Sequence, residues 1–87
     1  DLITFYTLAN EKLQAWELRR GSTAAAAAGT IHTDMERGFI RAEVADHADL
    51  LAAGSMAALR EGGRLRTEGR DYVVRDGDVI HFLFRAH

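Results

Sequence analysis

A chain of 87 residues is long enough for one domain but too short for a deep, enclosed active site, because a domain near this size hides only roughly 60 to 65% of the surface of its unfolded chain. Its composition, 47% hydrophobic and 28% charged, is in the ordinary range of globular proteins and argues against intrinsic disorder. The formal net charge of −2 excludes a general attraction to phosphate, so nucleic-acid binding would need a local basic patch.

Two absences in the sequence bear on the cellular setting. The chain has no Cys, which excludes disulfides and thiolate chemistry and is typical of a reducing compartment. No apolar run approaches the roughly 20 residues of a membrane span. We therefore expect a cytoplasmic location and no membrane partner. From the length we expect a single domain, residues 1–87. Because the chain starts at Asp1 rather than Met, we also expect this domain to be a fragment of a longer protein.

The first elements are two β-rich runs, residues 2–7 and 13–20, separated by the turn sequence ANEK. This pattern predicts a hairpin. In the second run Trp16 and Leu18 share one face, and we expect Trp16 in the core rather than as a platform for a base.

A short helix is predicted by the five consecutive Ala residues that follow the hairpin. Ser22 or Thr23 can cap its start, and Gly29 marks its weakened end. Residues 39–44 then alternate as a third strand, with Ile40, Ala42 and Val44 on one face.

Two short helical pieces are predicted between this strand and the last part of the chain. Asp46 is a cap for the first piece, Gly54 interrupts the pattern, and Ser55 caps the second. Gly62 and Gly63 end it.

The C-terminal stretch has two β-branched and aromatic runs that flank Asp76-Gly77, which predicts a tight hairpin. Ile80, Phe82 and Phe84 share one face of the last run, and the opposite face is also apolar, so we expect a central strand buried on both sides. The order of elements predicts an α+β fold of the ubiquitin-like β-grasp type, in which a mixed sheet packs on a short helix.

Three stretches carry a resemblance to a known family: AAGTIHTDMERGFIRAEV at 27–44, AWELRRGSTA at 15–24 and GRDYVVRDGDVIHFLF at 69–84. Together they resemble the C-terminal TGS domain of the YchF-type P-loop ATPases, which belong to the Obg-related GTPases. The likeness covers essentially the whole chain. One departure is the run of five Ala residues, where a more varied helix start is expected.

The resemblance implies a parent protein that binds ATP or GTP with Mg²⁺, but it places no cofactor in this chain. No G-x-x-x-x-G-K-[ST] motif occurs here, and Lys12 is the only Lys. The chain is therefore expected to have no catalytic activity of its own. What remains is recognition: relatives are thought to use the TGS domain toward the ribosome, RNA or regulatory partners. In stringent-response synthetases a similar His-containing loop lies near the acceptor end of tRNA, which makes His32 a candidate RNA contact.

The stretch HTDMERG, residues 32–38, admits several interpretations. A metal site would have only one nearby His among mixed N/O ligands, and catalysis by His32 and Asp34 would have no recognisable nucleophile. A structural loop would use Asp34 or Thr33 to cap a turn and Gly38 to adopt a backbone conformation that other residues resist. A partner surface would use His32 to stack on a base and Arg37 to grip phosphate.

Further basic residues extend the candidate surface. Ten of the eleven basic residues are Arg, the type suited to bidentate contacts with anions. Arg60, Arg64, Arg66 and Arg70 form the densest stretch, although acidic neighbours favour a solvated mixed-charge surface equally well. We expect His81 to be structural. The candidate partner or RNA-binding residues are His32, Asp34, Arg37, Arg41, Arg19 and Arg20.

Two other functional classes remain to be compared with RNA binding. A modifier or sulfur carrier needs a C-terminal Gly-Gly, but this chain ends in FRAH, with Gly62-Gly63 internal. A protein-docking module without nucleic-acid contact, bound to the parent's ATPase domain or to another factor, is the main alternative. A salt-dependent affinity for RNA would separate the two.

Overall fold

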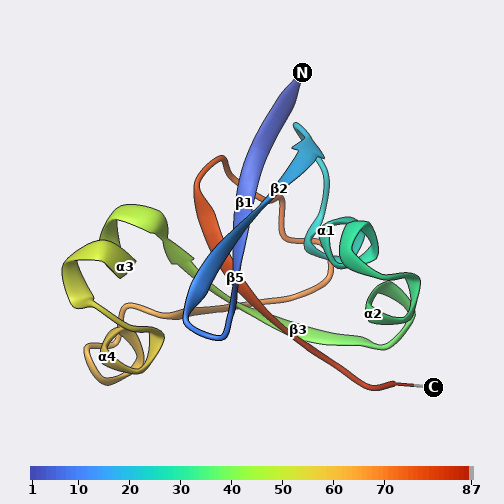
Figure 1. Cartoon of the computed structure of the whole chain (residues 1–87). Helices are drawn as coiled ribbons and strands as arrows, with labels where there is room; N and C mark the ends of the chain where they lie inside the picture. Colours follow the sequence, from blue (N-terminus) through green and yellow to red (C-terminus); the bar gives the residue numbers. More distant parts are fainter. Residues whose placement is uncertain (87) are drawn as a thin grey trace.

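The computed structural model describes residues 1–86, and Figure 1 shows the arrangement of their strands and helices. The chain forms in order β1 (Leu2–Ala9), β2 (Lys12–Arg19), α1 (Ala24–Ile31), α2 (Thr33–Arg37), β3 (Phe39–Asp46), α3 (His47–Ala53), α4 (Met56–Glu61), β4 (Arg66–Glu68) and β5 (Asp78–Phe84).

The five strands form one mixed sheet in the order β2-β1-β5-β3-β4. β1 and β5 are parallel, whereas the pairs β1–β2, β3–β5 and β3–β4 are antiparallel. The predicted α+β class, the mixed sheet and the central place of the last strand are thereby confirmed. The N-terminal hairpin is also confirmed, and Asn10 and Glu11 at its tip both have positive φ, as a two-residue turn requires.

The main core lies between the sheet and α1. Thr23 caps this helix by accepting a hydrogen bond from the Ala26 N–H at 3.2 Å. Ala24, Ala27 and Ala28 are fully buried, because a helix of small side chains can approach the sheet closely. The prediction that Gly29 ends the helix was wrong, since α1 continues to Ile31. A Cβ at Gly29 would overlap with the side chain of Glu36, so the glycine makes room for α2.

A smaller cluster forms where α3 and α4 pack against one end of the sheet. Leu50 and Leu59 from the two helices meet Val79 and Ala45 of the sheet. The two helical pieces begin and end where the sequence predicted. Asp46 accepts from the Ala48 N–H, Ser55 accepts from the Ala58 N–H, and Gly54 between them takes the left-handed conformation at φ 90°.

The alternation in β3 differs from the prediction. The register with β5 shifts between Phe39 and Arg41, and such an irregularity changes which residues face the core. Phe39 is therefore buried, whereas Ile40 is 48% exposed. Ala42 and Val44 face the core as predicted.

The predicted C-terminal hairpin was wrong. Asp76 and Gly77 dock on β1 instead: the Asp76 carboxylate accepts from the Thr4 N–H at 2.9 Å, and the Gly77 N–H donates to the Thr4 carbonyl at 2.8 Å. Val73 forms an isolated bridge with Thr23. The sequence pattern did not predict β4, which is the edge strand of the sheet and pairs with β3. The burial of β5 on both sides is also limited to its start, because His81 is exposed and Phe84 is 41% exposed.

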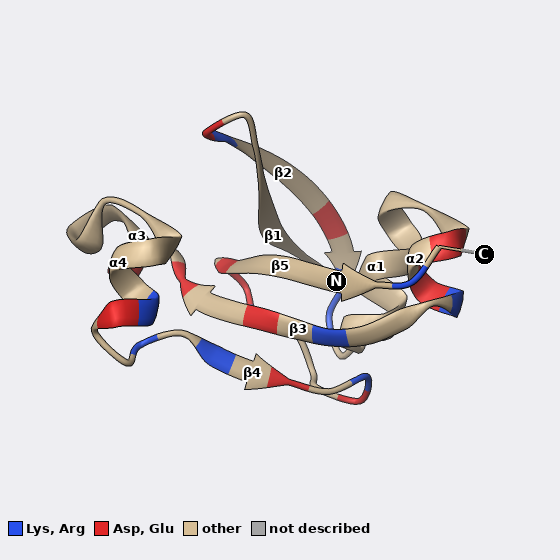
Figure 2. Ribbon diagram, turned by 90° about the horizontal axis from the view of Figure 1, so that it is seen from below, with Lys and Arg blue, Asp and Glu red and all other residues tan. Residues whose placement is uncertain are grey.

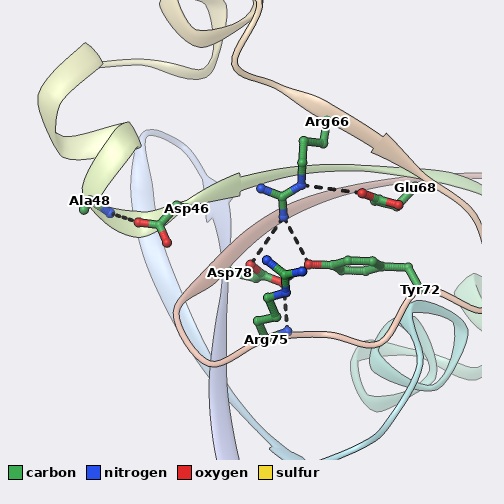
Figure 3. A network of polar contacts seen from close by, with 7 residues as sticks. All are labelled: Asp46, Ala48, Arg66, Glu68, Tyr72, Arg75 and Asp78. Carbon is green, nitrogen blue, oxygen red and sulfur yellow. Dashed lines mark hydrogen bonds and ion pairs between the residues drawn. The ribbon is translucent and has the colours of Figure 1, made fainter.

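A polar network fixes the start of β5 (Figure 3). Asp78 is 3% exposed, and its Oδ2 accepts hydrogen bonds from the Tyr72 hydroxyl at 2.6 Å and the Arg75 N–H at 2.9 Å. The Arg66 guanidinium also donates to the Tyr72 oxygen, at 3.1 Å. Burial, together with the hydrogen bond to Asp78, raises the pKa of Tyr72. The network ties β4 and the loop before β5 to the sheet.

The change Tyr72→Phe tests this network. Loss of the hydroxyl removes one donor from a buried carboxylate, so the free energy of unfolding should fall by about 1 to 2 kcal/mol. Urea unfolding followed by circular dichroism measures the change. Tyr6→Phe is the matched control, because the ring of Tyr6, which stacks on His47 at a centroid distance of 5.0 Å, is kept in the variant. Equal stability of Tyr72→Phe and the wild type would contradict the anchoring role.

Candidate functional site

The stretch HTDMERG, expected to be a loop, contains the short helix α2. His32 caps it: the ring Nδ1 accepts a hydrogen bond from the Asp34 N–H at 3.0 Å. The expected caps, Thr33 and Asp34, lie inside the helix instead. When the ring is neutral, its proton lies on Nε2, because Nδ1 is the acceptor. The side chain is 62% exposed, so the Nε2 edge is accessible to a partner.

Gly38 joins α2 to β3, and its role differs from the prediction. Its φ is −93°, an ordinary value that needs no glycine. The constraint is close approach: a Cβ would overlap with the carbonyl oxygen of Arg85, and the Arg85 N–H donates to the Gly38 carbonyl at 2.8 Å. The last residues of the described chain therefore cross the α2–β3 junction.

Several arginines lie close to this junction along the backbone, and the side chain of Arg70 contacts it directly. Arg70 reaches it from the loop after β4, donating from Nη1 to the Glu36 carbonyl at 3.3 Å and lying over the Phe39 ring at 5.6 Å from its centroid. Arg37 ends α2, and Arg41 lies in β3 opposite Leu83. Figure 2 shows basic segments on α2, on β3 and near the C-terminus toward the same end of the molecule. We call the set His32, Arg37, Arg41, Arg70 and Arg85 the basic junction.

Two members of the basic junction came from outside the predicted set. Arg85 carries no signal in the sequence, because only the pairing of β5 with β3 brings it beside Gly38. Arg70 was grouped with the basic stretch 60–70, but arginines of this stretch contact different partners and form no common surface. Within residues 1–86, Arg60 pairs with Glu43, whereas Arg66 pairs with Glu68 and Asp78.

Arg19 and Arg20 lie away from the basic junction. β2 ends near the N-terminus, whereas α2 and the start of β3 lie near the other terminus of the chain (Figure 1). Arg20 forms an ion pair with Asp1 at 2.5 Å, and Arg19 is paired in register with Leu2. Of the six candidate residues, His32, Asp34 and Arg37 lie on or next to α2, and Arg41 follows on β3.

A second polar cluster centres on Glu43 in β3. Its Oε1 accepts from Arg60 of α4 at 2.8 Å and lies 2.9 Å from His81 Nδ1 on β5. The hydrogen bond with His81 and the contact with Arg60 lower the pKa of Glu43, and they outweigh the opposing effect of burial. The cluster ties α4 to the sheet, and it neutralises the positive charge of Arg60.

The part of the chain that the structure describes holds neither a candidate metal site nor a helix that could span a membrane. Residues 1–86 bring no group of three His, Cys, Asp or Glu side chains into an arrangement that could hold a metal ion. Among the helices of the same residues, none is long and apolar enough to cross a membrane.

Residues 2–85 match a protein-family model. This model is that of the YchF GTPase C-terminal region, described as a protein of unknown function (DUF933).

Individual relatives show the same likeness. The chain is 52% identical over 85 residues to the ribosome-binding ATPase YchF of Bacillus subtilis, covering 98% of this chain and 23% of the relative. It is 51% identical over 85 residues to Obg-like ATPase 1 of Oryza sativa subsp. japonica, covering 98% and 22%. The solved structure of the Schizosaccharomyces pombe YchF GTPase matches with a TM-score of 0.86 and 35% identity, covering 94% of this chain and 22% of that one. The chain thus spans less than a quarter of the length of these relatives.

The change Glu43→Gln tests the second cluster through pH. Because folding lowers the pKa of Glu43 below 4.5, its contribution to stability is present above the unfolded pKa and is lost as pH falls through the folded one. Urea midpoints measured between about pH 6 and pH 3 should therefore fall less steeply for the variant, which should be less stable by about 0.5 to 1 kcal/mol at the upper end. Glu61→Gln, at an exposed residue of α4, is the control. Identical pH profiles for Glu43→Gln and the wild type would argue against the cluster.

Proposed function

We propose that this chain, which belongs to the YchF GTPase C-terminal family, is a non-catalytic recognition domain that contacts the ribosome or RNA through its basic junction. The observation that carries the proposal is the match, over nearly the whole chain, to relatives that are named ribosome-binding ATPases. The fold is the TGS-like α+β fold of that family.

The chemistry of the basic junction supports RNA as the ligand. Guanidinium groups suit phosphate oxygens, and an exposed imidazole can stack on a base or donate from Nε2 to it. The Arg70 guanidinium is held at the junction by its hydrogen bond to the Glu36 carbonyl, and the backbone of Arg85 is held beside Gly38. One cationic group of the surface is therefore placed before a ligand arrives. Asp34 and Glu36, which lie on the same short helix, limit the number of phosphates that the junction can contact.

The parent protein supplies the catalytic part of this proposal. It hydrolyses ATP or GTP with Mg²⁺ at a P-loop outside this chain, and residues 1–87 act as one domain of it. tRNA and ribosomal RNA are both compatible with the junction, and the parent acts in the cytoplasm. The alternative is a protein-docking module, which is favoured by an open groove that apolar residues such as Trp16 and Met35 line.

Binding to purified ribosomes and to tRNA at two salt concentrations tests the proposed function. The variant His32→Asn/Arg37→Gln keeps a capping side chain at residue 32 and removes one positive charge. We expect the wild type to lose affinity between about 50 and 200 mM salt, and the variant to bind more weakly with a salt slope reduced by about 1.

The matched control is Arg64→Gln, which removes one exposed arginine in the turn after α4, away from the junction. It should bind like the wild type, and circular dichroism should show that all three proteins are folded. No binding by the wild type, or equal loss in the control and the junction variant, would refute the basic junction as the RNA contact.

A further inference from the structure

An open groove lies where the N-terminal hairpin separates from the central strand. Its volume is about 520 Å³, within the range of known ligand sites. Both Figure 1 and Figure 2 show β1 and β2 diverging from β5 toward the tip of the hairpin. Within residues 1–86, β1 and β5 share a single register pair, Tyr6 with Val79. Thr7–Ala9 of β1 and Ile80–Phe82 of β5 then line the groove.

The separation leaves two strand edges facing the groove. β1 is paired with β2 along its whole length, and β5 is paired with β3 as far as Phe84, so both remain extended past the point where they part. Backbone groups on such an edge form hydrogen bonds with any added strand. The ligand that matches this feature is another extended polypeptide backbone.

The remaining walls of the groove suit apolar side chains. Trp16 comes from β2, Ile31 and Met35 from the helices over the main core, and Met56 from α4. All four are half-buried. Met side chains are flexible and polarizable, so they adapt to ligands of different shape. Leu8, 39% exposed, extends the apolar surface toward the hairpin tip.

The charges and the aromatic ring of the groove disfavour a nucleotide. Arg60 and His81 are its basic side chains, and both already contact the carboxylate of Glu43. Trp16 stacks on Phe5 at a centroid distance of 6.5 Å, and its indole N–H donates to Thr7 Oγ1 at 2.9 Å. The groove therefore offers no unshared cation for a phosphate, and one face of its indole ring is already covered.

We propose that this groove binds an extended peptide segment of a separate partner protein, which adds a strand beside β5 and places apolar side chains at alternate positions against Trp16 and Met35. A groove lined by half-buried, adaptable side chains suits an exchangeable ligand better than a permanent interface, which is more apolar and closely packed. The binding mode is strand addition combined with apolar pockets. It is independent of the proposed RNA contact, which lies at the basic junction.

Selection of peptides tests the proposal. A displayed library of random peptides of about ten residues, long enough to span a strand, is panned on the chain, and enriched peptides are synthesised. We expect apolar residues at alternate positions, slower amide hydrogen exchange at residues 80–84 on binding, and loss of binding when alternate peptide nitrogens are methylated. Failure to enrich any peptide above selection on an empty support would overturn the proposal.

Two groove variants and one control locate the binding. Gln14, on β2, and Met35, on α2, both line the groove. Gln14 is exposed whereas Met35 is half-buried, so Gln14→Lys should fold even if Met35→Lys does not. Each should weaken the enriched peptides by at least about tenfold. Ile40→Lys changes an exposed apolar residue of β3 outside the groove and should bind normally. Displacement of the peptides by oligouridine, or equal weakening by Ile40→Lys, would also overturn the proposal.

The source of the segment is tested with the parent-length protein. It should bind the selected peptides as the isolated chain does. If it fails to bind them, the groove is occupied by the parent's own polypeptide, and a separate partner is ruled out.

Discussion

The whole sheet depends on the insertion of β5 between β1 and β3. Without it, the hairpin β1–β2 and the pair β3–β4 would be two separate ribbons, and a two-stranded ribbon is marginal in water. β5 also supplies Ile80 and Phe82 to the main core and Val79 to the smaller one. The buried carboxylate of Asp78 fixes where this strand starts, and its partners Tyr72 and Arg75 belong to the segment that leads into it. A long-range strand pairing and a local polar network thus stabilise the same element.

The elements that could be predicted are those with local signals. Asp46, Gly54 and Ser55 mark the ends of α3 and α4 because caps act over a few residues. The errors arose where a distant segment decided the outcome. Asp76-Gly77 is a good hairpin signal, but hydrogen bonds to Thr4 of β1 use its polar groups. β4 has three residues, too few to show a period, and it exists because the edge of β3 is available.

The candidate site divides in the same way. The exposure of His32 and Arg37 follows from their polar surroundings in the sequence, whereas the cap made by His32 depends on the turn between α1 and α2. Arg85 joins the junction only because β5 runs antiparallel to β3 and ends beside Gly38. The groove had no sequence signal at all. Thr7 and Leu8 continue a regular hairpin with β2, and no local pattern indicates that the pairing of β1 with β5 ends at Tyr6.

The two surfaces share one small element, α2. This helix has five residues, none of them buried, so its position depends on the cap at His32, the packing of Met35 on the core and the contacts of Gly38. Met35 lines the groove, and Arg37, two residues later, belongs to the basic junction. A ligand that contacts Met35 therefore contacts the helix that carries Arg37. The groove and the basic junction therefore adjoin at α2, and a substitution in this helix can affect both surfaces through its packing.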